Sequence, residues 1–136
     1  MTPRPPDEQA EIEAVIQLLP TAWNTRDAQL FASAFTDPHD YIAVGGRLML
    51  GLTREANMQA HTRLWQTLYA EGSTIRFEIL SIDRPVPGVA LAIVKNHNDF
   101  VASGQARSLQ SILSLVLLQA EQGWRIRQFN NSLVQG

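Results

Sequence analysis

One side chain in the sequence is well suited to acid–base chemistry inside a fold, and that side chain is His61. Thr53 is typical of a helix N-cap, and in the helix that follows it His61 shares a face with Leu64 and Trp65. An imidazole can act as a general base because it titrates near neutral pH. A histidine on an apolar face can also be a core residue that is hydrogen-bonded to a neighbouring strand. We expect His61 beside a cavity, as the candidate catalytic residue and as a ligand contact.

Asn130 is a second candidate ligand contact because of its place in the last predicted strand, residues 124–133. Strand alternation puts Asn130 on the same face as Trp124 and Ile126, so that face passes from apolar to polar along the strand. A ligand pocket with an apolar floor and a polar mouth has this pattern. Asn130 can equally be an ordinary surface residue near the terminus.

Arg107 is a third candidate ligand contact, with two open interpretations. In the predicted strand 106–119, Arg107 points to the same face as Leu109. A charge buried on an apolar face is costly unless it is paired. Arg107 therefore either grips a carboxylate or enolate of a ligand or is solvated at an exposed strand end. For His97, as for Arg107, the strand pattern is compatible with both a pocket and a solvent-facing position.

Metal and cofactor sites are not indicated by the sequence. No pair among His39, Asp40, His61 and His97 has the spacing of metal ligands on one element, and cysteine is absent. A phosphate-binding glycine loop and a serine nucleophile elbow are also missing. We predict no metal and no cofactor, so any reaction would be acid–base chemistry that the side chains perform alone.

Three helices are predicted before residue 73. Asp7 is a typical N-cap for the first, which carries an apolar stripe through Trp23, and Asp27 caps a second that runs to about Phe35. The third follows Thr53 and ends at Gly72. Aromatic side chains of this region are candidate walls of a ligand cavity, although aromatics at helical spacing are also common in cores. They are Trp23, Phe31, Phe35, Tyr41 and Trp65.

From Ser73 the apolar period changes from 3.6 to 2, which predicts antiparallel strands. We expect strands around 75–82, 89–99, 106–119 and 124–133, with a bulge near Ile79 and a turn over 84–88. Short strands at 41–44 and 47–50 flank a hairpin turn at Gly45-Gly46. The order of elements predicts an α+β fold, with the helices gathered on one face of a bent sheet.

The predicted strand 106–119 is apolar on both of its faces. An antiparallel strand of this kind needs cover on both sides, and the three helices can cover only one. We therefore predict a two-fold homodimer that packs through the outer face of the sheet.

Length and charge limit the remaining classes. A chain of 136 residues forms one domain, which we place at 7–136 after a disordered proline-rich tail at 1–6. The net charge of −2 and the absence of a basic run argue against nucleic acid as a partner. No run is apolar enough for a membrane span, and the tail is not a signal peptide. Together with the absence of cysteine, this leads us to expect a cytoplasmic protein.

Several short motifs occur in a particular order along residues 7–136. They are Trp23-Asn24, Asp27-Ala28, Phe31, Phe35, Gly46, Gly51, Thr53-Arg54-Glu55, His61, Gly123-Trp124-Arg125-Ile126 and Asn131-Ser132. Together they resemble a SnoaL-like protein, and more narrowly the SgcJ/EcaC group of the nuclear transport factor 2-like superfamily. The resemblance implies a cone-shaped α+β roll, also described as cystatin-like, in which a strongly bent mixed or antiparallel sheet and three N-terminal helices enclose a pocket.

The resemblance implies a class of function without choosing one activity. It favours a small-molecule-binding protein whose pocket takes a hydrophobic or carbonyl-bearing ligand, and which can be a cofactor-independent isomerase, cyclase or dehydratase. The alternative is a non-catalytic dimerisation or protein-association module. The chain departs from the isomerase pattern, since residues 41–44 carry no acid where those enzymes have their catalytic carboxylate. Asn130 also stands where many relatives have histidine.

Overall fold

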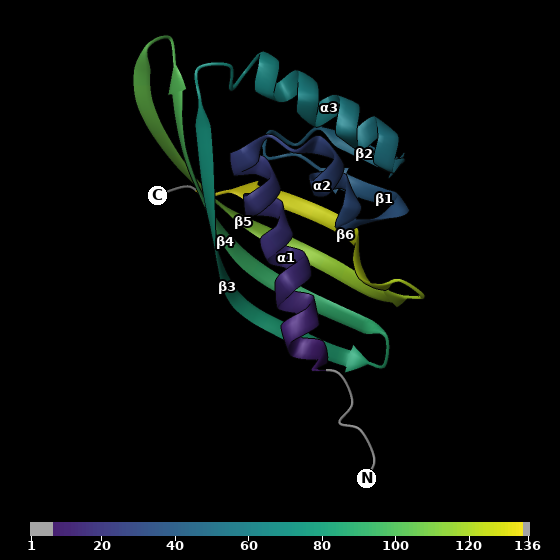
Figure 1. The fold of residues 1–136 in the computed structure, drawn as a ribbon. Helices are drawn as coiled ribbons and strands as arrows, with labels where there is room; N and C mark the ends of the chain where they lie inside the picture. The colour runs from purple at the N-terminus through teal and green to yellow at the C-terminus, as the bar shows by residue number, and fades with distance from the viewer. Residues whose placement is uncertain (1–6, 135–136) are drawn as a thin grey trace.

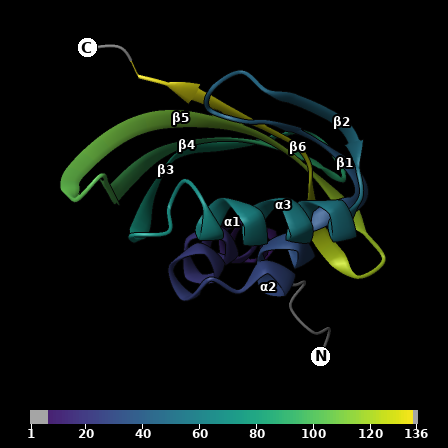
Figure 2. The same cartoon turned by 90° about the horizontal axis from the view of Figure 1, so that it is seen from above.

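The computed structural model describes residues 7–134, and the predicted tail at 1–6 lies outside the described residues. Three helices cover the concave side of one strongly bent sheet, as Figure 1 shows from the helical side and Figure 2 from above. The elements are α1 (Glu8–Thr25), α2 (Ala28–Ser33), β1 (Phe35–Ile42), β2 (Leu48–Leu52), α3 (Arg54–Gln66), β3 (Ser73–Val86), β4 (Val89–Ala102), β5 (Gln105–Ala120) and β6 (Gly123–Leu133). The predicted α+β roll is confirmed.

The sheet has the strand order β2-β1-β6-β5-β4-β3. All neighbouring strands are antiparallel except β1 and β6, which pair in parallel, so the sheet is mixed. A register irregularity between Ile79 and Ser81 gives β3 the bulge that the sequence predicts. Within residues 7–134, no helix is long and apolar enough to cross a membrane.

All three predicted helix N-caps are present. A side-chain oxygen of Asp7 accepts from the amide of Ala10, and that of Asp27 accepts from the amide of Leu30. The hydroxyl of Thr53 accepts from the amide of Ala56 at 3.1 Å. Each contact satisfies a backbone donor that the helix itself leaves free, which is worth about 1 kcal/mol per cap.

Two helix ends differ from the prediction. The second helix stops at Ser33, and Phe35 starts β1, because Phe35 pairs with Ile126 of the parallel strand β6. The third helix ends at Gln66 and not at Gly72, since the carbonyl of Leu64 accepts from the amides of both Thr67 and Tyr69 and closes the last turn. Tertiary pairing and a tight terminal turn override the helical periodicity at these places.

The predicted turn at 84–88 is shorter in the structure. Val86 pairs with Val89, so β3 continues through Arg84 and Pro85, and Pro87 and Gly88 form the turn. Gly88 has a φ of +82°, which a side chain would strain.

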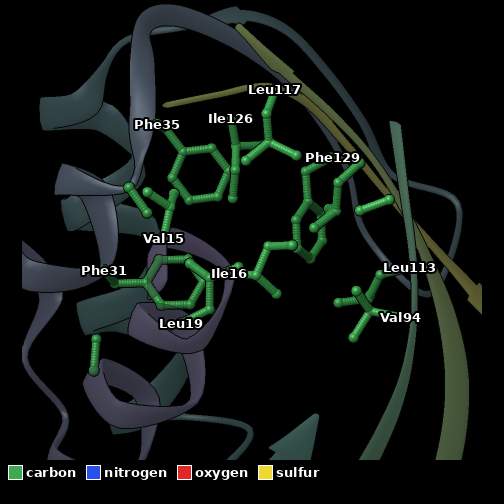
Figure 3. Close-up of a cluster of buried hydrophobic side chains, with 14 of the residues drawn as sticks. Val15, Ile16, Leu19, Phe31, Phe35, Val94, Leu113, Leu117, Ile126 and Phe129 are labelled. Carbon is green, nitrogen blue, oxygen red and sulfur yellow. The ribbon is translucent and has the colours of Figure 1, made fainter. Parts of the chain in front are cut away.

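The core lies between α1 and the concave face of the sheet. Ile12, Ile16 and Leu19 of α1 are fully buried. Figure 3 shows Ile16 and Leu19 on the side of the sheet that carries Leu113 and Leu117. This packing holds α1 across the sheet and so fixes one wall of the space between the helices and the sheet.

Candidate functional site

A cavity of about 400 Å³ lies between the helices and the concave face of the sheet. Side chains from every helix reach it, and the hairpin of β1 and β2 closes one side. Its lining includes Trp23 of α1, Phe31 of α2, His61 and Leu64 of α3, Tyr41, Arg47 and Met49 of the hairpin, and Phe77, Asn96, Leu113, Phe129 and Asn131 of the sheet. The walls are therefore mainly apolar, with few polar groups.

A hydrogen-bonded pair of side chains, Tyr41 and His61, forms the polar centre of the cavity. The Tyr41 hydroxyl lies 3.3 Å from Nε2 of His61, and Nδ1 of His61 lies 2.9 Å from the carbonyl oxygen of Asn57. A carbonyl oxygen only accepts, so Nδ1 carries the proton and donates it to Asn57. Nε2 is then the acceptor of the Tyr41 hydroxyl.

Burial keeps both members of the Tyr41–His61 pair uncharged. His61 is 4% exposed, and the loss of hydration lowers its pKa to about 4. The hydrogen bond to the Asn57 carbonyl raises the pKa, but this effect is smaller than that of burial. Burial also raises the pKa of Tyr41. At neutral pH the cavity thus holds a neutral donor and a neutral acceptor, not an ion pair.

His39 links β1 to α3 behind this pair. It is fully buried and stacks on Phe35, with ring centroids 4.4 Å apart. Its Nδ1 donates to the carbonyl of Thr36 at 2.9 Å, and its Nε2 accepts from the side-chain amide of Asn57 at 3.0 Å. Burial lowers the pKa of His39 as well. Asn57 therefore contacts both histidines and fixes the position of the helical turn that carries His61.

The strand β4 supplies the polar part of the sheet wall. Its inward residues are first apolar, at Ala90, Ala92 and Val94, and then polar at Asn96 and Asn98. The apolar-to-polar gradient that the sequence suggested for the last strand is thus found on β4.

The two inward asparagines of β4 differ in how their amides are used. Asn98 donates to the Tyr69 hydroxyl at 3.3 Å and accepts from Ser73, whose hydroxyl also accepts from the indole of Trp23. Asn96 donates to Ser111 at 3.2 Å, and its amide oxygen is buried with no partner in the described residues. Asn98 therefore holds the wall together, while Asn96 keeps unused hydrogen-bonding capacity.

A bulge in β6 decides which asparagine of the last strand reaches the cavity. Ile126 pairs with Leu117 and Gln128 pairs with Val116, so two steps along β6 match one step along β5. The extra residue reverses the alternation beyond it. Phe129 and Asn131 consequently line the cavity, whereas Asn130 does not, so the predicted inward position of Asn130 is corrected.

Comparison with known proteins identifies the family. A family model for the SnoaL-like domain matches residues 12–135. The chain belongs to the SnoaL-like family. No functionally curated protein matches this SnoaL-like chain.

Solved structures resemble the SnoaL-like chain in fold. A domain of unknown function with a cystatin-like fold from Nostoc punctiforme has a TM-score of 0.83 and 20% identity over 98% of this chain and 81% of its own. A ketosteroid isomerase-like protein from Erwinia carotovora atroseptica has a TM-score of 0.78 and 17% identity, covering 96% and 99%. An NTF2-like protein with a cystatin-like fold from Novosphingobium aromaticivorans has a TM-score of 0.78 and 20% identity, covering 96% and 84%. These likenesses establish the cystatin-like, NTF2-like fold.

Four of the predicted site residues come together in the SnoaL-like cavity: Trp23, Phe31, Tyr41 and His61. Trp65 and Phe35 lie behind this wall. Trp65 packs edge-on against Trp23 with centroids 5.6 Å apart, and Phe35 is fully buried in the core.

The remaining predicted polar residues lie elsewhere. Arg107 is exposed, lines a separate open depression near the start of β5, and donates to Gln105 at 3.4 Å. His97 has the opposite parity to Asn96 and Asn98, so it faces away from the cavity. Within residues 7–134, no group of three histidine, cysteine, aspartate or glutamate residues could hold a metal ion.

Sequence reasoning did not name several polar residues of this region as site residues. They are Asn57, which contacts both histidines, and the lining residues Arg47, Tyr69, Asn96, Asn98 and Asn131. A signal existed for Asn57, which lies four residues before His61 and so shares its helical face. A signal also existed for Asn96, which follows the inward parity of Val94. Strand alternation does not predict the inward position of Asn131, because the bulge that turns it inward arises from pairing with β5.

Proposed function

We propose that this SnoaL-like protein binds a small, mainly apolar molecule in the cavity between its helices and its sheet. The observation that carries the proposal is an open volume of about 400 Å³ beside the Tyr41–His61 pair. Pockets for drug-sized ligands have volumes of roughly 300–1,000 Å³. A cavity filled by its own aromatic side chains would instead favour a pure association module.

The polar groups of the cavity support a ligand with a hydroxyl group that can donate to an amide oxygen. Tyr41 and His61 are neutral, and Asn96 and Asn131 each have a buried amide oxygen without a partner in the described residues. A buried amide gains when a ligand completes its hydrogen bonds, because an unpaired polar group costs about 1–3 kcal/mol. We propose hydrogen bonds of this kind as the source of specificity, and the binding needs no cofactor.

Titration with the neutral fluorophore N-phenyl-1-naphthylamine tests this proposal. Its emission rises in apolar surroundings, so we expect saturable binding at one site per chain. Ala60 lines the cavity from α3, and Ala60→Phe should fill the space and abolish binding. Ala14 is exposed on α1, so the matched variant Ala14→Phe should bind as the original protein does. Equal binding by both variants, or no saturable binding at all, would contradict the proposal.

Acid–base turnover is a second candidate, favoured by the contact between the Tyr41 hydroxyl and Nε2 of His61. When the Tyr41 hydroxyl turns to donate to a ligand carbonyl, the unprotonated Nε2 is released and could remove a proton next to that carbonyl, as an isomerase, cyclase or dehydratase requires. The ketosteroid isomerase-like neighbour supports this direction at the level of fold. We expect His61 to exchange the α-protons of bound 2-decanone with deuterium, as measured by proton NMR. Unchanged exchange in His61→Ala would exclude His61 as the base.

Pairing of two copies through the outer sheet face is proposed as well. The outward residues of β4 and β5 include Leu91, which is 41% exposed, and the half-buried Ile93, Ile112 and Val116. Apolar groups on an otherwise uncovered sheet face favour such packing.

We also propose that the chain belongs to the SgcJ/EcaC group and that the protein is cytoplasmic. The location is supported by the absence of cysteine from the sequence.

A further inference from the structure

Arg47 is the one charged side chain that lines the cavity within the described part of the chain. It lies in the turn between β1 and β2, opposite Ala43, whose amide donates to the Arg47 carbonyl at 3.0 Å. Between residues 7 and 134, no carboxylate oxygen lies within 4.0 Å of its guanidinium, and no side-chain hydrogen bond involves it. Arg54, by comparison, donates to the carbonyl of Phe35 at 2.8 Å.

The alternation of the hairpin places Arg47 at the rim of the cavity. Arg47 and Met49 both line it, whereas Leu48 and Leu50 between and beyond them are 59% and 66% exposed. Met49 pairs directly with Tyr41 across the hairpin. Two residues of a strand span ~7 Å, so the Arg47 backbone lies about that far from the level of the Tyr41–His61 pair.

Charge differs between the rim and the interior of the cavity. No aspartate or glutamate is among the lining residues in the described part of the chain. Deep in the cavity, the polar groups of Tyr41, His61 and Asn96 are uncharged at neutral pH. Burying an ionised group there without a countercharge is costly, so an anionic group of a ligand would remain near Arg47.

We infer that the ligand is an apolar molecule with one anionic group, whose anion meets the Arg47 guanidinium at the rim while its apolar body fills the cavity. This inference rests on the proposed function and narrows the substrate class of the same site. The guanidinium is planar and presents paired N–H donors that match the oxygens of a carboxylate or sulfonate. An apolar cation would meet repulsion at the same place.

Two fluorophores that differ by one anionic group provide the test. 8-Anilinonaphthalene-1-sulfonate has the ring system of N-phenyl-1-naphthylamine together with a sulfonate. We expect the protein to bind the sulfonate about fivefold more tightly, which corresponds to about 1 kcal/mol for a solvent-accessible ion pair. Arg47→Gln should remove this preference, so that the two probes bind this variant with equal affinity. Arg63 is exposed on α3 outside the cavity, so Arg63→Gln should retain the preference.

Salt and a filled cavity provide further controls. Raising the salt concentration from 0.05 M to 0.5 M should shrink the preference, because exposed charge pairs are screened. Binding of both probes should be lost in Ala60→Phe. Sulfonate binding that persists in Ala60→Phe would come from the surface and would overturn the inference.

The remaining outcomes separate the inference from the proposed function. Equal affinities for the two probes, or an unchanged preference in Arg47→Gln, would overturn the inference while binding of the neutral probe kept the proposed function intact. Failure of both probes to bind would overturn the proposed function and the inference together. Thermal unfolding of Arg47→Gln should match that of the original protein, since the side chain contacts no partner within residues 7–134.

Discussion

The burial of neutral His61 predicts a specific dependence of stability on pH. The pKa of His61 is about 4 in the folded protein, against 6.5 in the unfolded chain. Because the folded value is lower, the unfolded chain binds a proton on this imidazole first as the pH falls. The stabilisation is therefore complete above the unfolded pKa and is lost between about pH 6.5 and pH 4.

The size of the loss follows from the two pKa values. Linkage gives a decrease in the free energy of unfolding of about 1 kcal/mol at pH 6 and about 2 kcal/mol at pH 5. Below pH 4 the loss levels off at about 3 kcal/mol. A domain of this size has a total stability of ~5–15 kcal/mol, so the change is measurable by urea unfolding.

A variant isolates His61 from the other groups that titrate in this range. His61→Gln cannot take up the proton but retains His39, whose lowered pKa acts in the same direction, and all carboxylates. We compare how much the free energy of unfolding decreases between pH 7.5 and pH 5 in the two proteins. The decrease should be about 2 kcal/mol smaller in His61→Gln than in the original protein. Equal decreases in the two proteins would show that His61 is accessible or charged in the folded state, and would refute the reasoning.

Three further predictions concern the core, the cavity wall and the outer sheet face. Ile16→Ala should lower the free energy of unfolding by about 2–5 kcal/mol in urea titrations, because it leaves a void between α1 and the sheet; a loss below 1 kcal/mol would contradict this packing. Asn98→Ala should lower the free energy of unfolding by about 1–3 kcal/mol in the same titrations, because Ser73 and Tyr69 lose the side chain that both contact. An unchanged free energy of unfolding would contradict this hydrogen-bond network. Val116→Lys on the outer sheet face should convert a dimer to a monomer, as measured by light scattering at micromolar concentration. The control Thr62→Lys, at an exposed position of α3, should leave the mass at twice that of one chain. A monomeric original protein would refute the pairing.

The parts of the fold that local chemistry determines could be predicted from the sequence. Asp7, Asp27 and Thr53 start the helices as expected because each contacts a backbone amide only three residues away. His61 was predicted to lie at a cavity from helical spacing alone, and it lines one. The assignment failed at Phe35, where pairing with the distant Ile126 replaces a helical turn by a strand.

The polar half of the candidate site depends on contacts between strands, so a single strand pattern could not give it. Alternation along β6 predicts the wrong asparagine because one extra residue near Arg127 shifts the phase. Likewise, His39 and Asn57 belong to different elements, and their hydrogen bond exists only after β1 and α3 pack together.

The distribution of charge in the cavity favours ligand binding over strong base catalysis. A general base works best when its pKa is near the working pH, and burial has moved that of His61 to about 4. A base this weak removes protons slowly, yet its lone pair is a permanent acceptor that orients the Tyr41 hydroxyl. Because the described residues of the cavity interior carry no charge, the Arg47 guanidinium at the rim is the group that would distinguish an anionic end of a proposed ligand from its apolar end. In the proposed complex, the rim cation and the neutral interior dipoles orient the ligand, and the same orientation would position a carbonyl for slow proton transfer.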